Sequence, residues 1–561
     1  MPNSNYDVIV IGGGLLGCFT ARSLTRYAMA CSRVENADSQ SQSQSQSQSQ
    51  SQSQSPAPLK VALLEKREDI CTGISRANTA IVYSGYDTKP GTVKSSMCVR
   101  AAQSFPALCE ELGVRYSPCG SIMVCFGERG ASVLRKKLRD GIENGVRGVR
   151  FLSGDEVLQL EPNLSKDVHS GLFAPDTGTV MPWELCLAAA ENAVANGVEI
   201  IRNAEVKKIA RDSAGYIVET GDDKNVPVFH SRGIVNCAGL CADAVLEKVF
   251  EPTVRIVPDA GDYFVLDTKA QGFIRHVIFH ELEEKGKGLT LVPTVDGNIL
   301  VGPTERSLAE ARGREADEAG ATRPGRIDRD GGDAEDMGFE TAIEGLDSLR
   351  SMVAEVIPGL PMEHVIRSFG AVRPNPYEVE VTGDRDQGSG RGSQDSGYGE
   401  KVTGSDVRLS DRSVNDFCIV EEKDEAFISF VGVKTPGLTC ANELGEYAAD
   451  RLADRLGAKT NKNFDPRREA PVRLVDLSFE ERERFVRVNP DYGRVVCRCG
   501  RITEGEALDA IRRRPGAVTL DGVKHRAGTG LGRCQGGFCT QHIAELLSRE
   551  LGGKPEDFLS R

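Results

Sequence analysis

The chain has 561 residues, of which 39% are hydrophobic and 27% charged, and its formal net charge is −13. This length predicts roughly three or four domain-sized units, and the acidic charge argues against nucleic acid as a partner, because phosphate backbones would be repelled. No stretch approaches the ~18–20 apolar residues of a membrane span, so we expect no transmembrane segment.

The sixteen cysteines are many for one chain. Most are scattered in apolar surroundings, where a free thiol behaves as a small hydrophobic side chain. The first predicted strand begins at Tyr6, which leaves too little room for a targeting peptide. We therefore expect a reducing, cytoplasmic location.

The first predicted element is a buried strand at residues 6–12, rich in Val and Ile. It leads into residues 12–17, which read GGGLLG and precede a helical pattern. In a G-x-G-x-x-G motif of this kind, Gly12 permits the tight turn, Gly14 lets the backbone approach a pyrophosphate, and Gly17 lets the helix pack on the strand. The motif predicts a dinucleotide-binding fold.

Residues 39–55 are an uninterrupted Ser-Gln repeat, which has nothing apolar to bury and is expected to be disordered. The next predicted strand, residues 60–65, ends in Glu65. With residues 31–58 set aside as an insertion, Glu65 lies about 25 residues after Gly12, close to the ~20 expected for the acid that binds a ribose. The alternative is an exposed glutamate at a strand end.

Residues 234–239 read IVNCAG, a strand followed by small residues that would let a flavin or its pyrophosphate pass close to the backbone. No second G-x-G-x-x-G follows a strand, which suggests that the reductant is an organic substrate and not NAD(P)H. Residues 306–337 and 382–413 are rich in Gly, Asp and Arg and are interpreted as solvated insertions.

Four side chains are candidates for the substrate pocket. Arg373 follows an apolar strand, and its planar guanidinium suits a carboxylate or phosphate, although a structural ion pair is the alternative. Lys434 is a second anion contact or a contact to the reduced flavin, unless it faces solvent. Tyr83 and Tyr263 line the pocket or pack in the core.

Four cysteines near the C-terminus stand apart from the others: Cys497, Cys499, Cys534 and Cys539. Four thiolates can hold a [2Fe–2S] cluster, two on each iron. Zinc sites usually use C-x₂-C pairs, which the C-x-C and C-x₄-C spacing here does not match. The alternatives are a zinc site or four free thiols. Between the pairs, Thr503 and Glu506 predict a helix that starts with a capping box.

Several segments resemble one known family in the right order. Residues 73–91, 261–267, 291–304, 369–374 and 431–439 resemble the D-amino-acid-oxidase-like FAD oxidoreductases. More narrowly, they are similar to anaerobic-type glycerol-3-phosphate dehydrogenases and L-2-hydroxyglutarate oxidases. The C-terminal cysteine segment resembles the bacterioferritin-associated-ferredoxin type of [2Fe–2S] domain, which also ends the anaerobic glycerol-3-phosphate dehydrogenase subunit.

The resemblance implies an α/β plus α+β architecture. A Rossmann-like FAD-binding domain with an interleaved antiparallel-sheet substrate domain would span residues 6–458. A linker at 459–493 and a small helical [2Fe–2S] domain at 494–557 would follow. Disordered insertions are expected at 34–57, 306–337 and 382–413.

The resemblance also implies roles for individual residues. Its FAD contacts would be Gly12, Gly14, Gly17, Glu65, Asn78, Thr79, Val206, Ala238, Gly239, Gly437 and Leu438. There are two departures from the family pattern: Tyr83 stands where many relatives have His, and Asp259 and Ala260 stand where relatives often carry a basic residue.

The implied function is oxidation of a small anionic alcohol by hydride transfer to FAD, with electrons leaving through a [2Fe–2S] cluster to an acceptor protein or a quinone-linked subunit. Glycerol 3-phosphate is the first expected substrate. An L-2-hydroxy acid such as 2-hydroxyglutarate, or an amino acid, is the alternative. A non-catalytic redox-sensing or electron-delivery module is an alternative of a different class.

Deleting residues 39–55 is expected to leave the flavin content and the melting temperature unchanged, because the closure entropy of a disordered loop grows only slowly with its length. Visible absorbance and calorimetry of the purified variant measure both quantities. A large loss of thermal stability would show that the repeat is part of the fold.

Overall fold

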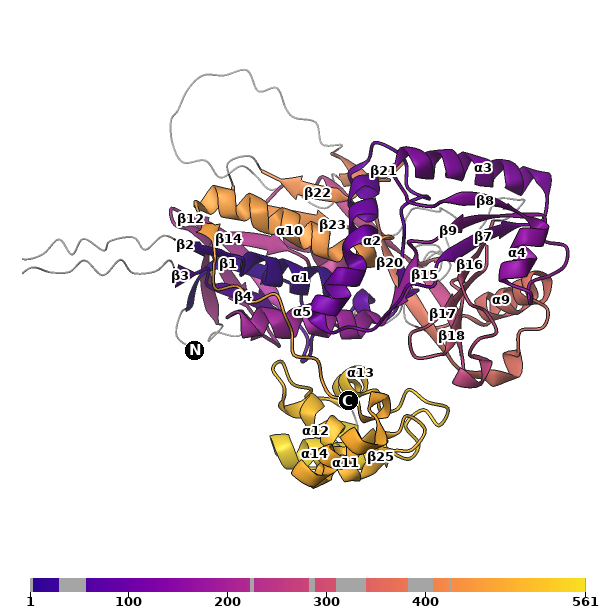
Figure 1. Cartoon of the computed structure of the whole chain (residues 1–561). Helices are drawn as coiled ribbons and strands as arrows, with labels where there is room; N and C mark the ends of the chain where they lie inside the picture. Colours follow the sequence, from indigo (N-terminus) through magenta and orange to yellow (C-terminus); the bar gives the residue numbers. More distant parts are fainter. Residues whose placement is uncertain are drawn as a thin grey trace, which may run out of the picture.

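The computed structural model describes residues 4–29, 57–221, 227–281, 288–308, 340–381, 407–422 and 425–559. The Ser-Gln repeat and most of the three expected insertions lie outside these residues. In Figure 1 the described chain forms two large lobes, and the C-terminal residues form a smaller third unit beneath them.

The first lobe is built on an eight-stranded sheet. Strands β11, β4, β1, β14 and β23 run parallel to one another, and β13, β12 and β22 add antiparallel edges. The strand bounds are β1 Ser4–Ile11, β4 Val61–Leu64, β11 Glu199–Ile201, β12 Val206–Asp212, β13 Gly215–Thr220, β14 Val228–Asn236, β22 Cys418–Glu421 and β23 Phe427–Val431. The predicted strands at 6–12, 60–65 and 234–239 are therefore confirmed as β1, β4 and the end of β14.

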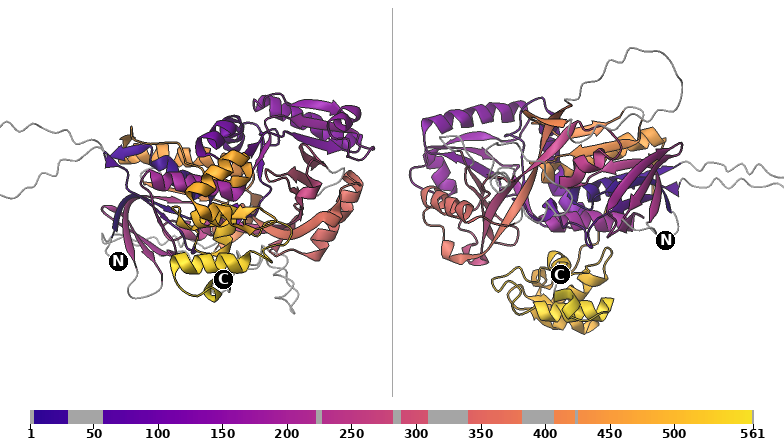
Figure 2. Two further views of the ribbon diagram at one scale, coloured as in Figure 1. Left: turned by 60° about the horizontal axis from the view of Figure 1, so that its bottom comes forward. Right: turned by 180° about the vertical axis from the view of Figure 1, so that it is seen from behind.

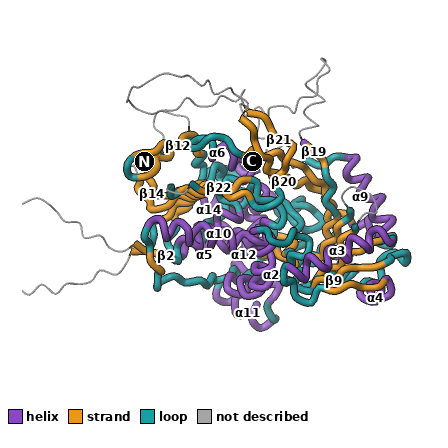
Figure 3. The backbone as a smooth tube through the Cα atoms, turned by 90° about the horizontal axis from the view of Figure 1, so that it is seen from above, coloured by secondary structure: helices purple, strands orange, loops and turns teal. Residues whose placement is uncertain are grey.

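Strand β1 is buried on both faces, which explains its unbroken apolar sequence. Val8 and Val10 point into the core under the helices, whereas Ile9 and Ile11 point into a second core on the opposite face. The first core is covered by four helices: α1 Leu15–Leu24, α2 Val93–Leu112, α5 Pro182–Ala195 and α10 Gly437–Leu456. Figure 3 shows α5 and α10 over this lobe, seen from above.

The second lobe contains a ten-stranded, mainly antiparallel sheet. Along the chain, groups of its strands come between groups of strands of the first lobe. Its bounds are β7 Ser121–Cys125, β8 Arg150–Ser153, β9 Ser170–Ala174, β15 Val254–Leu266, β16 Val277–His280, β17 Thr290–Pro293, β18 Ile299–Val301, β19 Arg306–Ser307, β20 Val365–Val381 and β21 Val407–Ser413. Helices α3 Glu128–Glu143, α4 Gly154–Leu160 and α9 Ile343–Val356 belong to this lobe.

Two strands of the second sheet correct the expected insertion bounds. Residues 306–307 form β19, which pairs with β15, and residues 407–413 form β21, which pairs with β20. Both segments were expected to be solvated loop. Their polar composition gave no strand pattern, and the neighbouring long strands supply the hydrogen bonds that hold them.

The C-terminal unit is small and mainly helical. Its elements are α11 Phe479–Val488, β25 Val495–Cys497, β26 Ile502–Thr503, α12 Glu504–Arg512, α13 Leu520–Ala527, α14 Thr540–Leu551 and α15 Glu556–Leu559. Helix α12 begins with the predicted capping box, in which the Thr503 hydroxyl accepts a hydrogen bond from the Glu506 N–H and the Glu506 carboxylate accepts one from the Thr503 N–H. These elements enclose their own apolar core.

The segment expected to be a linker packs against the first lobe. Asn192 donates hydrogen bonds to the carbonyl oxygens of Asp465 and Arg467 at 3.0 and 2.9 Å. The carboxylate of Glu191 accepts from Arg468 at 2.8 Å and from Arg513 of the C-terminal unit at 2.7 Å. The side chains of Glu191 and Arg468 are only 7% and 4% exposed, so these ion pairs fix the path of the chain between the two units.

A second buried ion pair attaches the C-terminal unit to the first lobe. Both terminal nitrogens of Arg526 bind the carboxylate of Asp69, at 2.7 and 2.8 Å, and the two side chains are 5% and 3% exposed. Arg202 lies 3.6 Å from the same carboxylate. Both views of Figure 2 place the C-terminal unit against the junction of the two lobes.

Within the residues that the structure describes, no helix has both the length and the apolar character needed to cross a membrane.

We expect Arg526→Ala to loosen the C-terminal unit, because the buried Asp69 carboxylate would lose its bidentate partner. Removing one member of a buried pair costs about 3–5 kcal/mol. Thermal unfolding and limited proteolysis between residues 461 and 493 measure the effect.

Arg512→Ala is the matched control for this variant. Arg512 also binds a carboxylate through two nitrogens, that of Glu550, but its side chain is 53% exposed. Its loss should cost less than about 1 kcal/mol. Equal effects of the two variants would show that the Asp69 pair does not hold the units together.

Candidate functional site

The turn between β1 and α1 depends on the absence of side chains. Gly12 has a φ of +108°, and a Cβ there would lie 2.4 Å from the carbonyl oxygen of Cys237 at the end of β14. A Cβ at Gly17 would lie 1.9 Å from the carbonyl oxygen of Gly12. These contacts bring helix α1 directly onto the strand ends, which is the arrangement expected from the motif.

Gly14 precedes the first turn of α1 and faces open space. A Cβ at Gly14 would meet only the hydroxyl of Ser75, at 3.1 Å. That hydroxyl accepts a hydrogen bond of 2.9 Å from the Leu15 N–H. Gly12, Gly14 and Leu15 line a cavity at the N-terminus of α1, the end of a helix that favours anions.

A cavity of about 970 Å³ begins at this turn and continues toward the second lobe. This volume lies near the upper end of the ~300–1,000 Å³ typical of small-molecule sites. Among the residues expected to bind FAD, those that line it are Gly12, Gly14, Glu65, Asn78, Thr79, Val206, Ala238, Gly239, Gly437 and Leu438. Gly17 does not line it, because it lies in the contact between helix and strand.

Glu65 is buried at the end of β4, and its carboxylate supports the glycine-rich turn. One oxygen accepts from the Gly13 N–H at 2.7 Å, and the other accepts from the Arg67 N–H at 2.9 Å. The carboxylate also lines the cavity, where the expected ribose contact stays a prediction. Glu65 thus has a structural role that its spacing from Gly12 did not indicate.

Aromatic rings of Tyr83, Tyr263 and Phe279 line the opposite end of the cavity, and Phe369, which packs on Tyr263, is not among its lining residues. The rings of Tyr263 and Phe369, on paired positions of β15 and β20, stack with centroids 4.6 Å apart and planes 2° apart. Tyr83 stacks on Phe279 at 5.9 Å. Burial raises the pKa of both tyrosines, so their hydroxyls stay protonated at neutral pH.

Arg373 lies at the same end, across the strand pair from Asp259. Its guanidinium donates to the Glu305 carboxylate at 3.0 Å and to the Thr304 carbonyl at 3.0 Å. A Cβ at Gly261 would lie 3.4 Å from the guanidinium, so the glycine leaves room for it. Arg373 thus makes the ion pair that was the alternative interpretation, and it also lines the cavity, where its contact with a substrate anion stays a prediction.

Lys434 also lines the cavity, near Arg373. Burial lowers the pKa of Lys434, and the neighbouring Arg373 lowers it further, whereas Asp259 raises it. Burial and Glu305 raise the pKa of Asp259. Two cations thus lie at this end of the cavity, with two carboxylates next to them.

Three of the four C-terminal cysteines have their sulfur atoms close together, and the fourth, Cys539, belongs to the same apolar core as Cys497. The sulfur of Cys499 is 3.8 Å from that of Cys497 and 3.5 Å from that of Cys534, and Cys539 is buried nearby at the start of α14. In the described part of the chain, no three His, Cys, Asp or Glu side chains surround one point as a single metal ion would require. A [2Fe–2S] cluster instead spreads four thiolates over two irons.

Backbone amides around Cys534 favour its thiolate. Burial raises the pKa of this thiol, but hydrogen bonds from Cys499 and from the N–H groups of Gly536, Phe538 and Gly537 lower it more, so the net pKa is below the usual value. Amides directed at thiolate sulfur are a common feature of iron–sulfur sites, where they tune the cluster.

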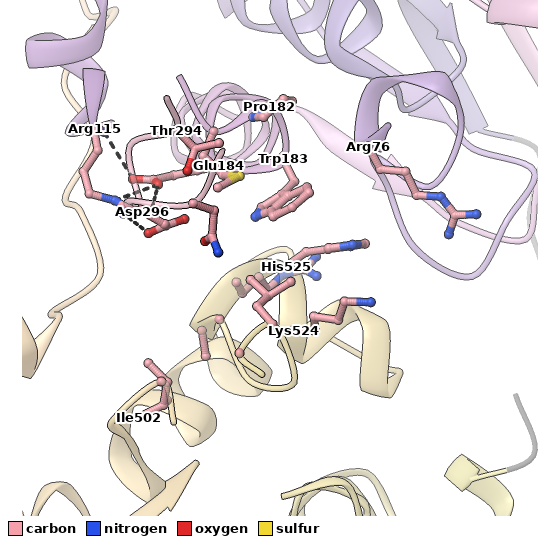
Figure 4. A pocket seen from close by; sticks show the side chains of 18 of the residues that line it. Arg76, Arg115, Pro182, Trp183, Glu184, Thr294, Asp296, Ile502, Lys524 and His525 are labelled. Carbon is pink, nitrogen blue, oxygen red and sulfur yellow. Dashed lines mark hydrogen bonds and ion pairs between the residues drawn. The ribbon is translucent and has the colours of Figure 1, made fainter. Parts of the chain in front are cut away.

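A second cavity of about 670 Å³ lies between the first lobe and the C-terminal unit. Ala77 and Asn78 line both cavities, and Cys499 lines the far side of this one. Figure 4 shows Trp183 of α5 facing His525 of α13 across it, with ring centroids 5.1 Å apart. The two cavities are therefore neighbours, with Ala77 and Asn78 bordering both.

Sequence reasoning missed several residues of this region. Ser75 lies inside the segment that resembles the family's flavin contacts, so that segment could have identified it. Glu305 directly follows the 291–304 motif. Phe279 and Phe369 look like ordinary strand residues, and only the pairing of distant strands shows that they stack on Tyr83 and Tyr263.

Comparison with family models gives two matches that together span most of the chain. Residues 7–451 match the model described as FAD dependent oxidoreductase. Residues 495–549 match the model described as BFD-like [2Fe-2S] binding domain.

Individual proteins agree with these matches. The chain is 33% identical over 555 residues to a glycerol 3-phosphate dehydrogenase of Caloramator mitchellensis, covering 98% of this chain and 95% of that protein. It is 27% identical over 301 residues to an L-2-hydroxyglutarate dehydrogenase of Escherichia coli, covering 53% and 63%.

One solved structure with a similar fold is the dithionite-reduced L-alpha-glycerophosphate oxidase of Mycoplasma pneumoniae with FAD bound. It has a TM-score of 0.63 and 22% identity, covering 84% of this chain and 100% of that one.

The residues present fit both cofactors. The side-chain-free turn at Gly12 and Gly14 leaves space for a pyrophosphate, and the cavity extends from it past Val206 and Gly239. Four thiols in two pairs provide the ligand set of a [2Fe–2S] cluster. FAD and a [2Fe–2S] cluster are the cofactors of this chain.

We expect Gly14→Val to yield folded protein that does not retain FAD, because its side chain would occupy the space of the pyrophosphate. Gly17→Val is the matched comparison. Its side chain would collide with the Gly12 carbonyl, so this variant should lose stability even without flavin. Flavin absorbance per protein and thermal unfolding by circular dichroism separate the two effects. Stoichiometric FAD in Gly14→Val would show that the dinucleotide lies elsewhere.

Proposed function

The chain belongs to the FAD-dependent oxidoreductases and ends in a BFD-like [2Fe–2S] binding domain, and on this basis we propose that it is a dehydrogenase of glycerol 3-phosphate. The observation that carries the proposal is the pair of cations, Arg373 and Lys434, in the cavity that the flavin-binding turn begins.

When bound, FAD supplies a two-electron acceptor for hydride and the [2Fe–2S] cluster supplies a one-electron carrier. The chain holds FAD through the β1–α1 turn and Glu65, and the residues proposed to lie along the isoalloxazine are Asn78, Thr79, Gly437 and Leu438. Cys497, Cys499, Cys534 and Cys539 hold the cluster.

Arg373 and Lys434 bind the substrate anion in this proposal. Two positive charges match a phosphate dianion, and the planar guanidinium offers parallel N–H donors to two of its oxygens. Glu305 occupies part of this donor set in the absence of substrate, so the phosphate displaces the Glu305 carboxylate when it binds. Tyr83, Tyr263 and their stacked partners exclude water from the reacting carbon.

The relative with 33% identity along nearly the whole chain acts, by its name, on glycerol 3-phosphate, which supports this substrate. L-2-hydroxyglutarate is the second candidate, because its dehydrogenases match about half of the chain and because a carboxylate also fits Arg373. A non-catalytic redox module would retain both cofactors but would not turn over either substrate.

The electron acceptor in this proposal is a separate protein or a quinone-linked subunit, since a dehydrogenase must pass on the electrons it takes. A cytoplasmic location is also part of the proposal. All cysteines among the described residues are free thiols, as expected in a reducing compartment.

Anaerobic mixing with glycerol 3-phosphate is expected to bleach the flavin absorbance, whereas L-2-hydroxyglutarate, proline and glycine should bleach it much more slowly. Bleaching only by 2-hydroxyglutarate would replace the proposed substrate. No bleaching by any member of the panel would favour the non-catalytic alternative.

Arg373→Ala should raise the KM for glycerol 3-phosphate by about 10- to 100-fold, because a charge-assisted hydrogen bond contributes roughly 1.5–3 kcal/mol. Steady-state kinetics with an artificial acceptor measure the KM. Arg129→Ala, at an exposed position on α3, is the control and should leave the KM unchanged. A normal KM in Arg373→Ala would place the anion site elsewhere, with Lys434 as the next candidate.

A further inference from the structure

The two segments that carry the cluster ligands are basic in an otherwise acidic chain. Residues 492–503 and 522–544 contain no Asp or Glu, although the chain holds 82 acidic against 69 basic residues. The Arg and Lys residues of these segments are Arg494, Arg498, Arg501, Lys524, Arg526 and Arg533. Positive charge is therefore concentrated around the four cysteines.

Part of this positive charge is used inside the molecule. Arg526 binds Asp69, Arg533 lies 3.4 Å from Asp267, and Lys524 lies 3.1 Å from Asp521. Arg526 and Arg533 bind residues of the first two lobes. Lys524 pairs within its own helix and lines the cavity between the units. The charges of these three residues are thus partly compensated within the molecule, although the Arg533 side chain is still 58% exposed.

The remaining basic side chains are next to the cysteine ligands in the chain, and one of them, Arg501, also borders the cavity toward the first lobe. Arg494, Arg498 and Arg501 are exposed, and the structure gives Arg498 and Arg501 no ion pair with any described residue. Arg494 contacts Glu504, but that carboxylate is shared with Arg549 and His542 and is only 2% exposed. Because Glu504 is a single buried carboxylate with several basic partners, it does not neutralise them all, and the surface stays positively charged.

Two apolar side chains and one cysteine ligand are exposed within this basic surface. Phe538 and Val495 are 77% and 53% exposed, and Cys499 is also exposed. The N–H of Phe538 donates to the Cys534 sulfur, which places residue 538 next to the ligand set. We call Arg494, Val495, Arg498, Arg501 and Phe538 the cluster face.

We propose that the cluster face is the docking surface for an acidic one-electron carrier protein. The inference rests on the proposed function, because it names the partner that would receive the electrons. Exposed apolar side chains next to charged ones are common in protein interfaces. The net charge of −13 repels an acidic partner on average, so a basic face attracts it locally and favours one orientation.

The first test measures binding. Soluble cytochrome b5, which is acidic, and cytochrome c, which is basic, are titrated into the purified holoprotein in a calorimeter. Cytochrome b5 should bind, and its affinity should fall as ionic strength rises from about 0.01 M to about 1 M, because the Debye length shrinks from ~30 Å to ~3 Å. Cytochrome c should not bind at the cluster face. No binding of cytochrome b5 at the low ionic strength would overturn the proposal.

Charge-reversal variants locate the surface. Arg498→Glu and Arg501→Glu should each weaken cytochrome b5 binding by about tenfold and flatten its salt dependence. Arg498→Lys should bind like the wild type, because it keeps the charge. Arg129→Glu on the distant helix α3 should also bind normally. Iron content and visible spectra confirm that each variant retains its cluster. Unchanged affinity in both Glu variants would overturn the proposal.

Electron transfer separates this inference from the proposed function. Each transfer removes one electron from the reduced protein and converts one haem iron from ferric to ferrous. Arg498→Glu should slow cytochrome b5 reduction while glycerol 3-phosphate still bleaches the flavin at the wild-type rate. Absent bleaching in the wild type would refute the proposed function, whereas normal bleaching with normal cytochrome reduction in Arg498→Glu would refute only the docking surface.

Two other occupants of this face would give distinct results. Vesicles containing anionic phospholipid would co-sediment with the protein if the basic, aromatic surface bound a membrane. If the face bound a second copy of the chain, sedimentation velocity would show a dimer that Arg498→Glu dissociates. Either result without cytochrome b5 binding overturns the proposal.

Discussion

A backbone contact sets the position of helix α1 and, through it, the rest of the first lobe. Gly17 rests on the Gly12 carbonyl, and Gly12 rests on Cys237 at the end of β14. Three chain segments meet there without a side chain between them. Helices α5 and α10 pack on α1, and the hollow at the N-terminus of α1 opens the cavity. Any added side chain at Gly12 or Gly17 would push the helix away and disturb all of these elements.

The sequence predicted the elements whose signals are local. The apolar run of β1, the spacing of three glycines and the Thr503 capping box each specify a structure within a few residues, and all were found. Glu65 became recognisable once the Ser-Gln repeat was set aside. The four cysteines were identified because their spacing is unusual for zinc. Local periodicity and turn chemistry explain why these predictions succeeded.

Features that depend on distant partners could not be predicted in this way. The segment at 459–493 looked like a linker because it is polar, but its Arg468 pairs with Glu191, far away in the chain. Strands β19 and β21 lack a strand pattern and form because β15 and β20 offer free edges. The Arg373–Glu305 contact follows from the same strand pairing. In each case the tertiary structure decides what the local composition leaves open.

The attachment of the C-terminal unit through one continuous chain has a consequence for stoichiometry. Every molecule carries the four cysteines and the flavin cavity in a fixed one-to-one ratio, and the chain between α10 and β25 keeps them adjacent. A short tether corresponds to an effective concentration in the millimolar range. Electron transfer between the flavin cavity and the cysteines is therefore an intramolecular step. It is first order in protein, and diluting the protein does not slow it.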